Sequence, residues 1–364
     1  MSRACSARRL AALVLLVLAA PAARAVDLHA LLGAFADDQL VPAYRGFAAD
    51  GAALAARAQA LCTGRPDAAK LAATRTAWRD AYVRWRGLDA VQFGPALDLR
   101  VGRALDAWPV RPRLVDEGLA RGPATLAFKD VGAQGKGLAA LEYLLWDPAR
   151  GEAELLAGLA GARCAYLLGA ARELAHEAAA LWVRWDPQRG RFAREIAEAG
   201  HFGADPRHPY LTERAALGEL VNRLVAGLEA SAGRRLARPA GLGAHGDPSP
   251  ERFEAARSGA TRAGLLAHLD AVRAVLNGPG GDAGLVAVLR DGGHAALAAR
   301  LDAAGQAAQA AVAALPEPLA AAVVERRAAI EAAFNALLAL RGLLETEVAT
   351  TVGVTMDFNE NDGD

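Results

Sequence analysis

Apolar residues recur at intervals of three and four along most of this chain, which is the spacing of one face of an α-helix. The segment 66–86 follows the pattern clearly and places Leu71, Trp78 and Trp85 on one face. No segment alternates between apolar and polar residues for long enough to indicate a strand. The pattern therefore predicts an all-α protein.

Prolines and glycines divide this pattern into separate helices. The expected helices are 27–61, with an interruption near Gly51, 66–86, 137–146, 152–185, 192–199, 209–236, 262–276, 285–315, with an interruption at its Gly-Gly pair, and 317–345. The stretch 87–129 is expected to be irregular, and 238–250 is expected to be a loop. The order predicts two helical-bundle subdomains in tandem, about 26–190 and about 205–364, with a seam near residues 186–208.

The first 25 residues have the features of a secretory signal peptide. Arg3, Arg8 and Arg9 precede the short apolar run 10–20, and a small-x-small cleavage pattern ends at Ala25. We expect cleavage after Ala25 and export to the periplasm or cell envelope. The apolar run is too short for a comfortable membrane span, and no second run approaches that length, so no transmembrane anchor is expected after cleavage.

Composition also points to a helical globular protein. Hydrophobic residues make up 53% of the chain and aromatic residues only 5%, with Ala and Leu dominant, which favours helix over sheet. The signal peptide holds four of the 41 Lys and Arg and none of the 41 Asp and Glu, so the remaining chain has a net charge of −4. This mildly acidic balance gives no reason to expect nucleic-acid binding.

Two cysteines remain after processing, Cys62 and Cys164. In an oxidising compartment the default is a disulfide between them, which would join two helices. A metal-binding or catalytic thiol is the alternative, but neither cysteine belongs to a CxxC pair or lies near a Cys/His cluster. We predict the disulfide.

The helix predicted at 137–146 carries a single carboxylate among apolar residues. Glu142 shares a face with Leu138 and Leu145. An ionised carboxylate on such a face is costly unless something pairs with it. Glu142 is therefore either neutralised by an arginine such as Arg79 or part of a functional site.

Several motifs along nearly the whole exported chain resemble those of the imelysin family. WRxxYxxW at 78–85, followed by QFGP at 92–95, is similar to the N-terminal signature of that family. The segment 137–146 resembles its GxHxxE helix, RxxY at 163–166 resembles the start of its next helix, and DFNENDGD at 357–364 resembles its closing FNxxDGD pattern. Their order and the match at the C-terminus make the resemblance specific.

The resemblance implies an all-helical fold of two bundle-like subdomains in the bacterial periplasm or cell envelope. The family is named for an insulin-cleaving metallopeptidase activity. Its members are also associated with iron acquisition, and they include the substrate-binding component of a periplasmic ferrous-iron importer. In the family, the His and Glu of GxHxxE are regarded as the metal-binding pair.

This chain departs from the motif at its histidine. Gly137 and Glu142 match, but Ala139 stands at the position of the His. His and Glu at i and i+3 lie on one helix face and can bind one cation, whereas a methyl group cannot. Glu142 alone would need ligands from other helices. We expect a site for a divalent metal, such as iron or zinc, that is weakened or lost, or that is rebuilt with other ligands.

Three residues could help to rebuild the site: Glu173, His176 and His201. Glu173-x-x-His176 has the spacing of carboxylate-bridged iron bundles, but a second such pair is missing. His176-Glu177 begins like the HExxH of zinc peptidases, but the second His is absent, which argues against that mechanism. His201 lies in the seam and would approach the motif helix only if the two subdomains fold together.

Two functions remain open. The first is a non-catalytic imelysin-like protein that serves iron or other metal acquisition by binding or by contact with a cell-envelope uptake component. The second is a metallopeptidase with a substituted ligand set around Glu142. A third, purely structural role would pair Glu142 with an arginine such as Arg79.

The acidic tail 357–364 begins like an EF-hand loop but ends before the last ligand, so it is expected to be structural.

Overall fold

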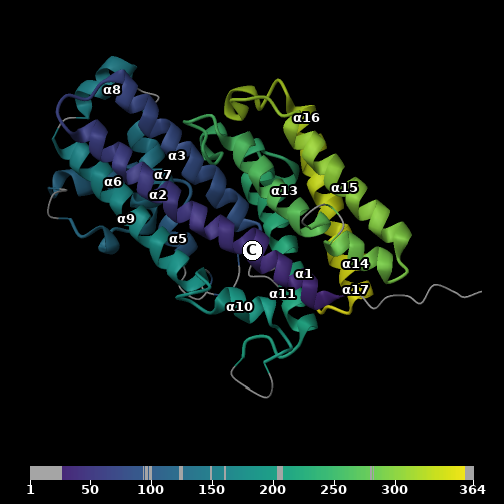
Figure 1. Cartoon of the computed structure of the whole chain (residues 1–364). Coiled ribbons are helices and arrows are strands. Elements are labelled where there is room, and N and C mark those ends of the chain that lie inside the picture. The colour runs from purple at the N-terminus through teal and green to yellow at the C-terminus, as the bar shows by residue number, and fades with distance from the viewer. Residues whose placement is uncertain are drawn as a thin grey trace, which may run out of the picture.

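The computed structural model describes residues 27–92, 94, 97, 101–122, 126–147, 150–159, 161–202, 208–278, 281 and 283–356. All regular secondary structure in these ranges is helical, and no strand occurs in them. The first half of the chain forms one bundle and the second half forms another beside it, coloured purple to teal and green to yellow in Figure 1. The predicted all-α fold is therefore confirmed. The expected signal peptide and the acidic tail lie outside the described residues.

Long helices dominate the first half. The helices are α1 (Leu28–Ala34), α2 (Val41–Cys62), α3 (Ala68–Asp89), α5 (Val101–Leu105), α6 (Pro112–Ala120), α7 (Gly137–Leu145), α8 (Glu152–Gly158), α9 (Ala162–Trp185) and α10 (Phe192–Ala197). A π-helical segment, Phe35–Leu40, joins α1 to α2 without a break. Helix α2 packs along both α9 and α3, and α7 packs against α9 and α3.

The second half repeats this style of packing. Its helices are α11 (Glu213–Glu229), α12 (Arg238–Ala240), α13 (Thr261–Asn277), α14 (Leu285–Asp291), α15 (Ala295–Ala313), α16 (Arg327–Gly342) and α17 (Ala349–Val352). Two further π-helical segments, Ala230–Ala237 and Leu343–Val348, continue α11 and α16. In the described ranges no single helix is long and apolar enough to cross a membrane. Helices α8 and α9 meet that condition of length and composition only as a pair, across a bend of 85°.

Local sequence explains where several helices begin. Asp67 precedes α3 and its Oδ1 accepts a hydrogen bond from the backbone N–H of Lys70 at 2.8 Å. Thr212 caps α11 in the same way, with Ala215 as donor at 3.1 Å. Such caps satisfy backbone donors that have no partner inside the helix. Within α3 the apolar face predicted from the sequence is buried, including Trp78.

Helix boundaries differ from the expected ones where glycine has another role. No interruption occurs near Gly51, because this glycine faces α9, where an added Cβ would lie 3.3 Å from the Cα of Ala175. Gly51 thus permits close packing of two helices. The segment 152–185 is instead two helices, and Gly161, with a φ of +63°, lies directly before the second. The stretch 87–129, expected to be irregular, contains the end of α3 and helices α5 and α6.

The two bundles share one hydrophobic core. Buried apolar side chains form a continuous cluster that runs from Leu31 in α1 to Ala349 in α17. Contacts between the halves involve α3 with α13 and α1 with α11. Functional residues from both halves can therefore meet at this interface. The subdomain limits 26–190 and 205–364 stay a prediction.

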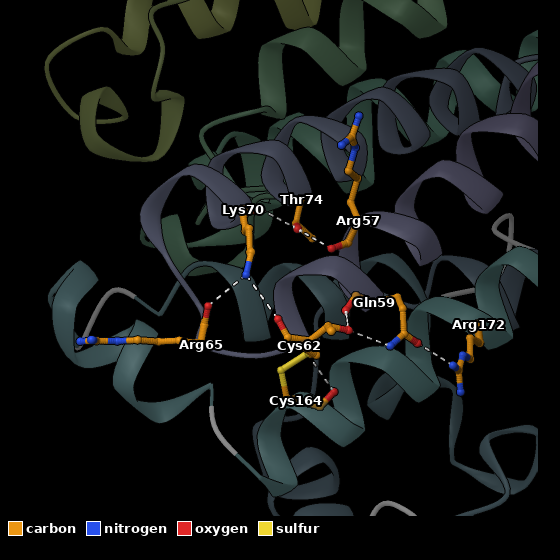
Figure 2. Close-up of a disulfide and its surroundings, with 9 residues drawn as sticks. Arg57, Gln59, Cys62, Arg65, Lys70, Thr74, Cys164 and Arg172 are labelled. Carbon is orange, nitrogen blue, oxygen red and sulfur yellow. Dashed lines mark hydrogen bonds between the residues drawn. A yellow bond between two sulfur atoms is a disulfide. The ribbon is translucent and has the colours of Figure 1, made fainter.

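A disulfide between Cys62 and Cys164 joins the end of α2 to the start of α9 (Figure 2). The two Cα atoms are 5.6 Å apart, and 102 positions separate the residues in the sequence. A guanidinium nitrogen of Arg172 also donates to Gln59 Oε1 at 2.7 Å, between the same two helices. The bond therefore reinforces the most extensively packed helix pair of the first half, α2 with α9.

Candidate functional site

Glu142 lies in the middle of α7 and its residue surface is 1% exposed. Leu138, Leu141 and Leu145 on the same short helix are fully buried. The helix is therefore a core element, as its apolar sequence predicts, and it carries one ionisable group into the interior. The chemistry of the site depends on what surrounds that carboxyl group.

Helix α7 begins at a glycine for a steric reason. Gly137 has a φ of +70°, and a Cβ at this position would lie 2.4 Å from the backbone oxygen of Leu105. An L-residue with a side chain disfavours this conformation and would also collide with the neighbouring backbone. Gly137 therefore allows α7 to start against the end of α5.

Replacing Gly137 with alanine should lower the free energy of unfolding by about 2 kcal/mol, from the left-handed conformation and the backbone collision together. Urea unfolding followed by circular dichroism would measure this loss. Gly342→Ala is the matched control, because Gly342 lies in a helix with nothing within 4 Å of an added Cβ. The control should gain about 0.5–1 kcal/mol. Unchanged or higher stability of Gly137→Ala would contradict this account.

Ser258, from the second half of the chain, is the hydrogen-bond partner of Glu142. Its backbone N–H and its Oγ both donate to Glu142 Oε1, each at 2.8 Å. Ser258 Oγ also lies 3.1 Å from the backbone oxygen of Ala255, so one hydroxyl proton has two acceptors in reach. A protonated Glu142 resolves this competition, because it can donate to Ser258 Oγ while the hydroxyl donates to Ala255.

The alternative in which an arginine such as Arg79 neutralises Glu142 is wrong for Arg79. In the described ranges Glu142 has no basic group within ion-pair distance. Arg79 instead donates to the backbone oxygen of Ser258 at 3.0 Å, and its guanidinium lies 5.0 Å from the centre of the Trp146 ring. The arginine therefore holds the partner of Glu142 rather than Glu142 itself.

The environment of Glu142 favours its neutral form. Burial raises the pKa of the Glu142 carboxyl to about 7, and the hydrogen bonds from Ser258 and the charge of Arg257 offset only part of this rise. Removal of a carboxylate from water disfavours its charged state, which is the cause of the shift. Glu142 therefore exchanges a proton near neutral pH.

The loop at 253–260 has an unusual conformation that delivers Ser258 to Glu142. Ala255 has a φ of +56°, the one non-glycine residue with positive φ in the described ranges. The backbone N–H of Ala260 donates to the oxygen of Ala255 at 3.0 Å and closes the loop. A non-glycine residue in this region costs roughly 1–2 kcal/mol, so the surrounding contacts hold the loop in place.

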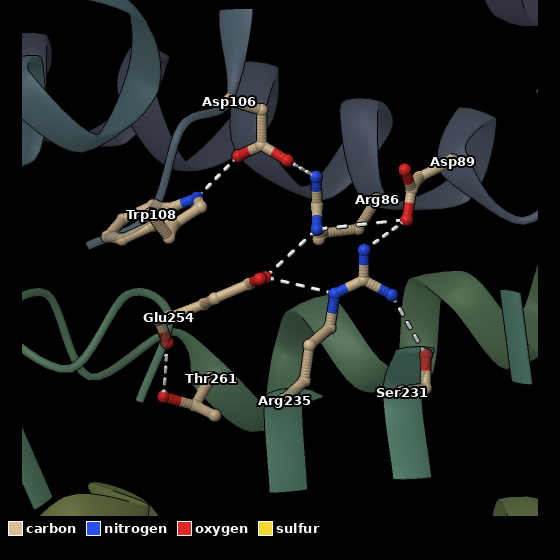
Figure 3. Close-up of polar contacts among 8 residues, drawn as sticks. All are labelled: Arg86, Asp89, Asp106, Trp108, Ser231, Arg235, Glu254 and Thr261. Carbon is tan, nitrogen blue, oxygen red and sulfur yellow. Dashed lines mark hydrogen bonds and ion pairs between the residues drawn. The ribbon is translucent and has the colours of Figure 1, made fainter. Parts of the chain in front are cut away.

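A buried ionic network anchors this loop through Glu254 (Figure 3). Glu254 Oε2 lies 2.9 Å from a guanidinium nitrogen of Arg86 on α3 and 3.0 Å from Arg235 Nε on the π-helical segment 230–237. Arg86 also pairs with Asp106, and Arg235 pairs with Asp89. Five charged groups from four separate segments thus meet at the interface of the two halves and fix the loop four residues before Ser258.

A surface hollow lies directly beside Ser258. It is lined in part by Arg79, Arg257, Ser258, Glu317 and Pro318. In the described ranges neither arginine has a carboxylate within 4 Å, whereas Glu317 is paired with Arg262. The hollow therefore offers two guanidinium groups with hydrogen-bonding capacity, which suits a carboxylate or a similar anion.

The three predicted helper residues have other neighbours. Glu173 on α9 pairs with Lys136 at 3.6 Å, and His176 on the same helix is exposed. His201 lies 2.9 Å from Glu213. In the described part of the chain, one group of at least three His, Cys, Asp or Glu side chains brings its ligand atoms together, and it contains His201 but not Glu142.

The residues around Glu142 do not fit a metal ion. Glu142 Oε1 accepts hydrogen bonds from the N–H and the hydroxyl of Ser258. These donors direct positively charged hydrogen atoms at the oxygen, where a bound cation would have to lie. Metal ions in proteins need several nitrogen, sulfur or oxygen ligands. Ala139 is fully buried beside Glu142 on α7 and supplies none.

Nothing in the sequence around Ser258 singled it out as a site residue. The structure brings Glu142, 116 positions away, into hydrogen-bond contact with it. No local pattern could have indicated this pair, because the two residues belong to different bundles. The buried network was also missed, since isolated charged residues in helices usually face solvent.

Comparison with known proteins gives consistent matches. The family model described as imelysin matches residues 40–344. Iron-regulated protein A of Synechococcus elongatus is 27% identical over 328 residues, which cover 87% of this chain and 85% of that protein.

Two solved structures have the same fold. An imelysin-like protein from Psychrobacter arcticum superposes with a TM-score of 0.72 and 22% identity, covering 92% of this chain and 99% of that one. A protein described as an iron-regulated protein A precursor, from Parabacteroides distasonis, gives 0.75 and 17%, covering 89% and 95%. At these identities the likeness demonstrates the all-helical architecture alone.

Proposed function

This chain belongs to the imelysin family, and from that premise we propose that it is an exported, non-catalytic protein of the cell envelope that serves iron acquisition. The name of the relative from Synechococcus elongatus, iron-regulated protein A, supports the link with iron. The word precursor in the name of the Parabacteroides distasonis protein supports export, as does the signal-like segment that ends at Ala25.

The environment of Glu142 is the observation that supports a non-catalytic protein. A metallopeptidase needs a bound metal that activates water, held by at least three protein ligands with an open position. Glu142 instead accepts two hydrogen bonds from Ser258 in a buried place. Ala139 adds no ligand. These contacts favour a family member in which the metal site of the motif is lost.

The hollow beside Ser258 is where we place ligand or partner contact. Arg79 and Arg257 present their guanidinium groups there without an acidic partner in the described ranges. Arg79 is exposed, so a bound anion can reach it from solvent. A carboxylate carried by an iron chelate fits this pair of groups, because arginine binds carboxylates through two parallel hydrogen bonds.

The first test is calorimetric titration of the chelator-stripped protein, residues 26–364, with Fe²⁺ and Zn²⁺. Wild type and Glu142→Gln should give the same isotherm, and neither should cleave an unfolded polypeptide. Stoichiometric metal binding that disappears in Glu142→Gln would overturn the proposal in favour of a rebuilt metal site. Peptide cleavage that depends on Glu142 would establish the metallopeptidase instead.

The role in iron acquisition needs a cellular test. A deletion strain should grow more slowly than its parent under iron limitation and recover with the wild-type gene. We expect the Glu142→Gln gene to restore growth and an Arg79→Ala, Arg257→Ala double variant to restore it poorly. Growth of the deletion strain equal to that of the parent under iron limitation would contradict the proposed role.

A further inference from the structure

We propose that His29, His201 and Glu213 form a binding site for a divalent first-row transition-metal ion, with Zn²⁺ as its best-fitting occupant. The site would join α1 to the corner between α10 and α11. It shares no residue with the Glu142 site, and it does not depend on the function proposed above.

The three side chains come from three different elements. His29 belongs to α1, His201 follows α10, and Glu213 is the first residue of α11. One ligand atom from each lies within 4.8 Å of the others. His201 Nε2 and Glu213 Oε1 are 2.9 Å apart, and the centres of the two imidazole rings are 4.4 Å apart.

The spacing is close to what a tetrahedral ion requires. Zinc binds imidazole nitrogen and carboxylate oxygen at about 2.0–2.2 Å, which places ligand atoms about 3.4 Å from one another. His29 and His201 are exposed and Glu213 is half-buried, so small rotamer changes can close the remaining gap. Three protein ligands leave the fourth position for water or for a group from solvent.

The backbone holds the ligand-bearing segments together before any ion binds. Gly200 has a φ of +78°, and a Cβ on it would lie 3.0 Å from the backbone nitrogen of Glu213. The N–H of Gly200 donates to the oxygen of Tyr210 at 3.2 Å, and the N–H of His201 donates to the oxygen of Glu198 at 2.9 Å. The chain therefore brings His201 beside the start of α11 through its own fold.

Helix α1, near the N-terminus, supplies the third residue of the proposed site, His29. Its N-terminus is fixed by Asp27, whose Oδ1 accepts from the N–H of Ala30 at 2.9 Å, and the helix packs against α10 and α11. This packing carries His29 to His201. An ion held by all three residues would connect segments that are far apart in sequence and would stabilise the folded chain by mass action.

The donor set indicates which ions fit. Two imidazole nitrogens and one carboxylate suit Zn²⁺ and the neighbouring transition metals. Ca²⁺ and Mg²⁺ prefer oxygen ligands throughout, and this site offers a single carboxylate. A simple hydrogen bond between His201 and Glu213 would explain why these two residues lie together. It would not explain why the imidazole of His29 lies beside that of His201.

Calorimetric titration of the exported chain with Zn²⁺ tests the proposal. Wild type should bind one ion, and His201→Ala and His29→Ala should each weaken binding by at least about tenfold, because even groups that support a metal ligand carry that much affinity. His176→Ala is the matched control, since His176 is an exposed histidine outside the cluster. The control should bind like wild type, and Ca²⁺ should not compete at equal concentration.

A second readout separates metal binding from folding. Excess Zn²⁺ should raise the thermal midpoint of wild type and of Glu142→Gln, and it should raise the midpoint of His201→Ala clearly less, because that variant binds the ion more weakly. Because His201 is exposed, that variant should melt like wild type in the absence of metal. Equal affinity in wild type, His29→Ala and His201→Ala would overturn the proposal, and so would an equal loss in His176→Ala. Loss of binding in Glu142→Gln alone would move the metal to the other site and refute both proposals.

Discussion

Arg235→Leu should lower the free energy of unfolding by about 3–5 kcal/mol, because it leaves buried carboxylates without a counter-charge. Arg235 is almost fully buried and contacts Asp89, Glu254 and Ser231. After its removal, Arg86 alone would face three carboxylates. Asp89 illustrates the dependence: burial acts to raise its pKa, yet the guanidinium groups of Arg235 and Arg86 hold that pKa well below the usual range.

Urea unfolding at pH 7 would measure this loss. Arg234→Leu is the matched control, because Arg234 is the neighbouring arginine on the same π-helical segment and is exposed. The control should change stability by less than about 0.5 kcal/mol. The loss of stability in Arg235→Lys should lie between those of Arg235→Leu and Arg234→Leu. Lysine keeps the positive charge but cannot reproduce the planar set of N–H donors of the guanidinium group. A loss below about 1 kcal/mol in Arg235→Leu would mean that the network is not coupled to the fold as described.

The second large effect concerns Glu142→Gln, which should raise the free energy of unfolding by about 3 kcal/mol at pH 8 and change it little at pH 4. The carboxyl has a pKa of about 7 in the folded protein, against 4.5 for an unperturbed glutamate side chain. Between these values the unfolded chain loses the proton while the folded chain keeps it. Wild-type stability therefore falls as pH rises through this window and stays reduced above it.

Glutamine avoids this penalty and keeps the local contacts. It never ionises, and its Oε1 can still accept from the N–H and the hydroxyl of Ser258. Chemical unfolding of both proteins at intervals from pH 4 to 8.5 would trace the difference. Glu325→Gln serves as control, because Glu325 is exposed and should give less than about 0.5 kcal/mol at every pH. Lower stability of Glu142→Gln at pH 8 would show that an unseen positive group pairs with the carboxylate.

The buried network and the Glu142 site act on the same loop. Glu254 and Ser258 belong to one segment, and the oxygen of Glu254 also accepts from Thr261 Oγ1 at 2.6 Å. Loss of Arg235 should therefore loosen the contact of Ser258 with Glu142 as well as the fold. These contacts make the network a support for the site rather than a separate feature.

Helical periodicity identified Glu142 correctly as an anomaly, because one carboxylate on an apolar helix face is visible in sequence. One alternative paired Glu142 with an arginine such as Arg79, and that pairing does not occur. Arg79 does lie close, but it binds the backbone oxygen of Ser258 instead. Periodicity says which residues share a face of one helix, and it contains no information on which distant segment packs against that face.

The sequence by itself determined the helical class, the positions of helices such as α3, α7 and α13, and the burial of the motif helix, because these follow from local spacing, caps and breakers. It also indicated the Cys62–Cys164 pair that the structure joins. Only the tertiary structure decided that Ser258 meets Glu142 and that His29 lies beside His201. It also decided that two arginines and three carboxylates form the network that holds the loop of Ser258. The physical reason is that these contacts depend on how helices distant in the chain pack together, and close packing rather than local conformation sets their partners.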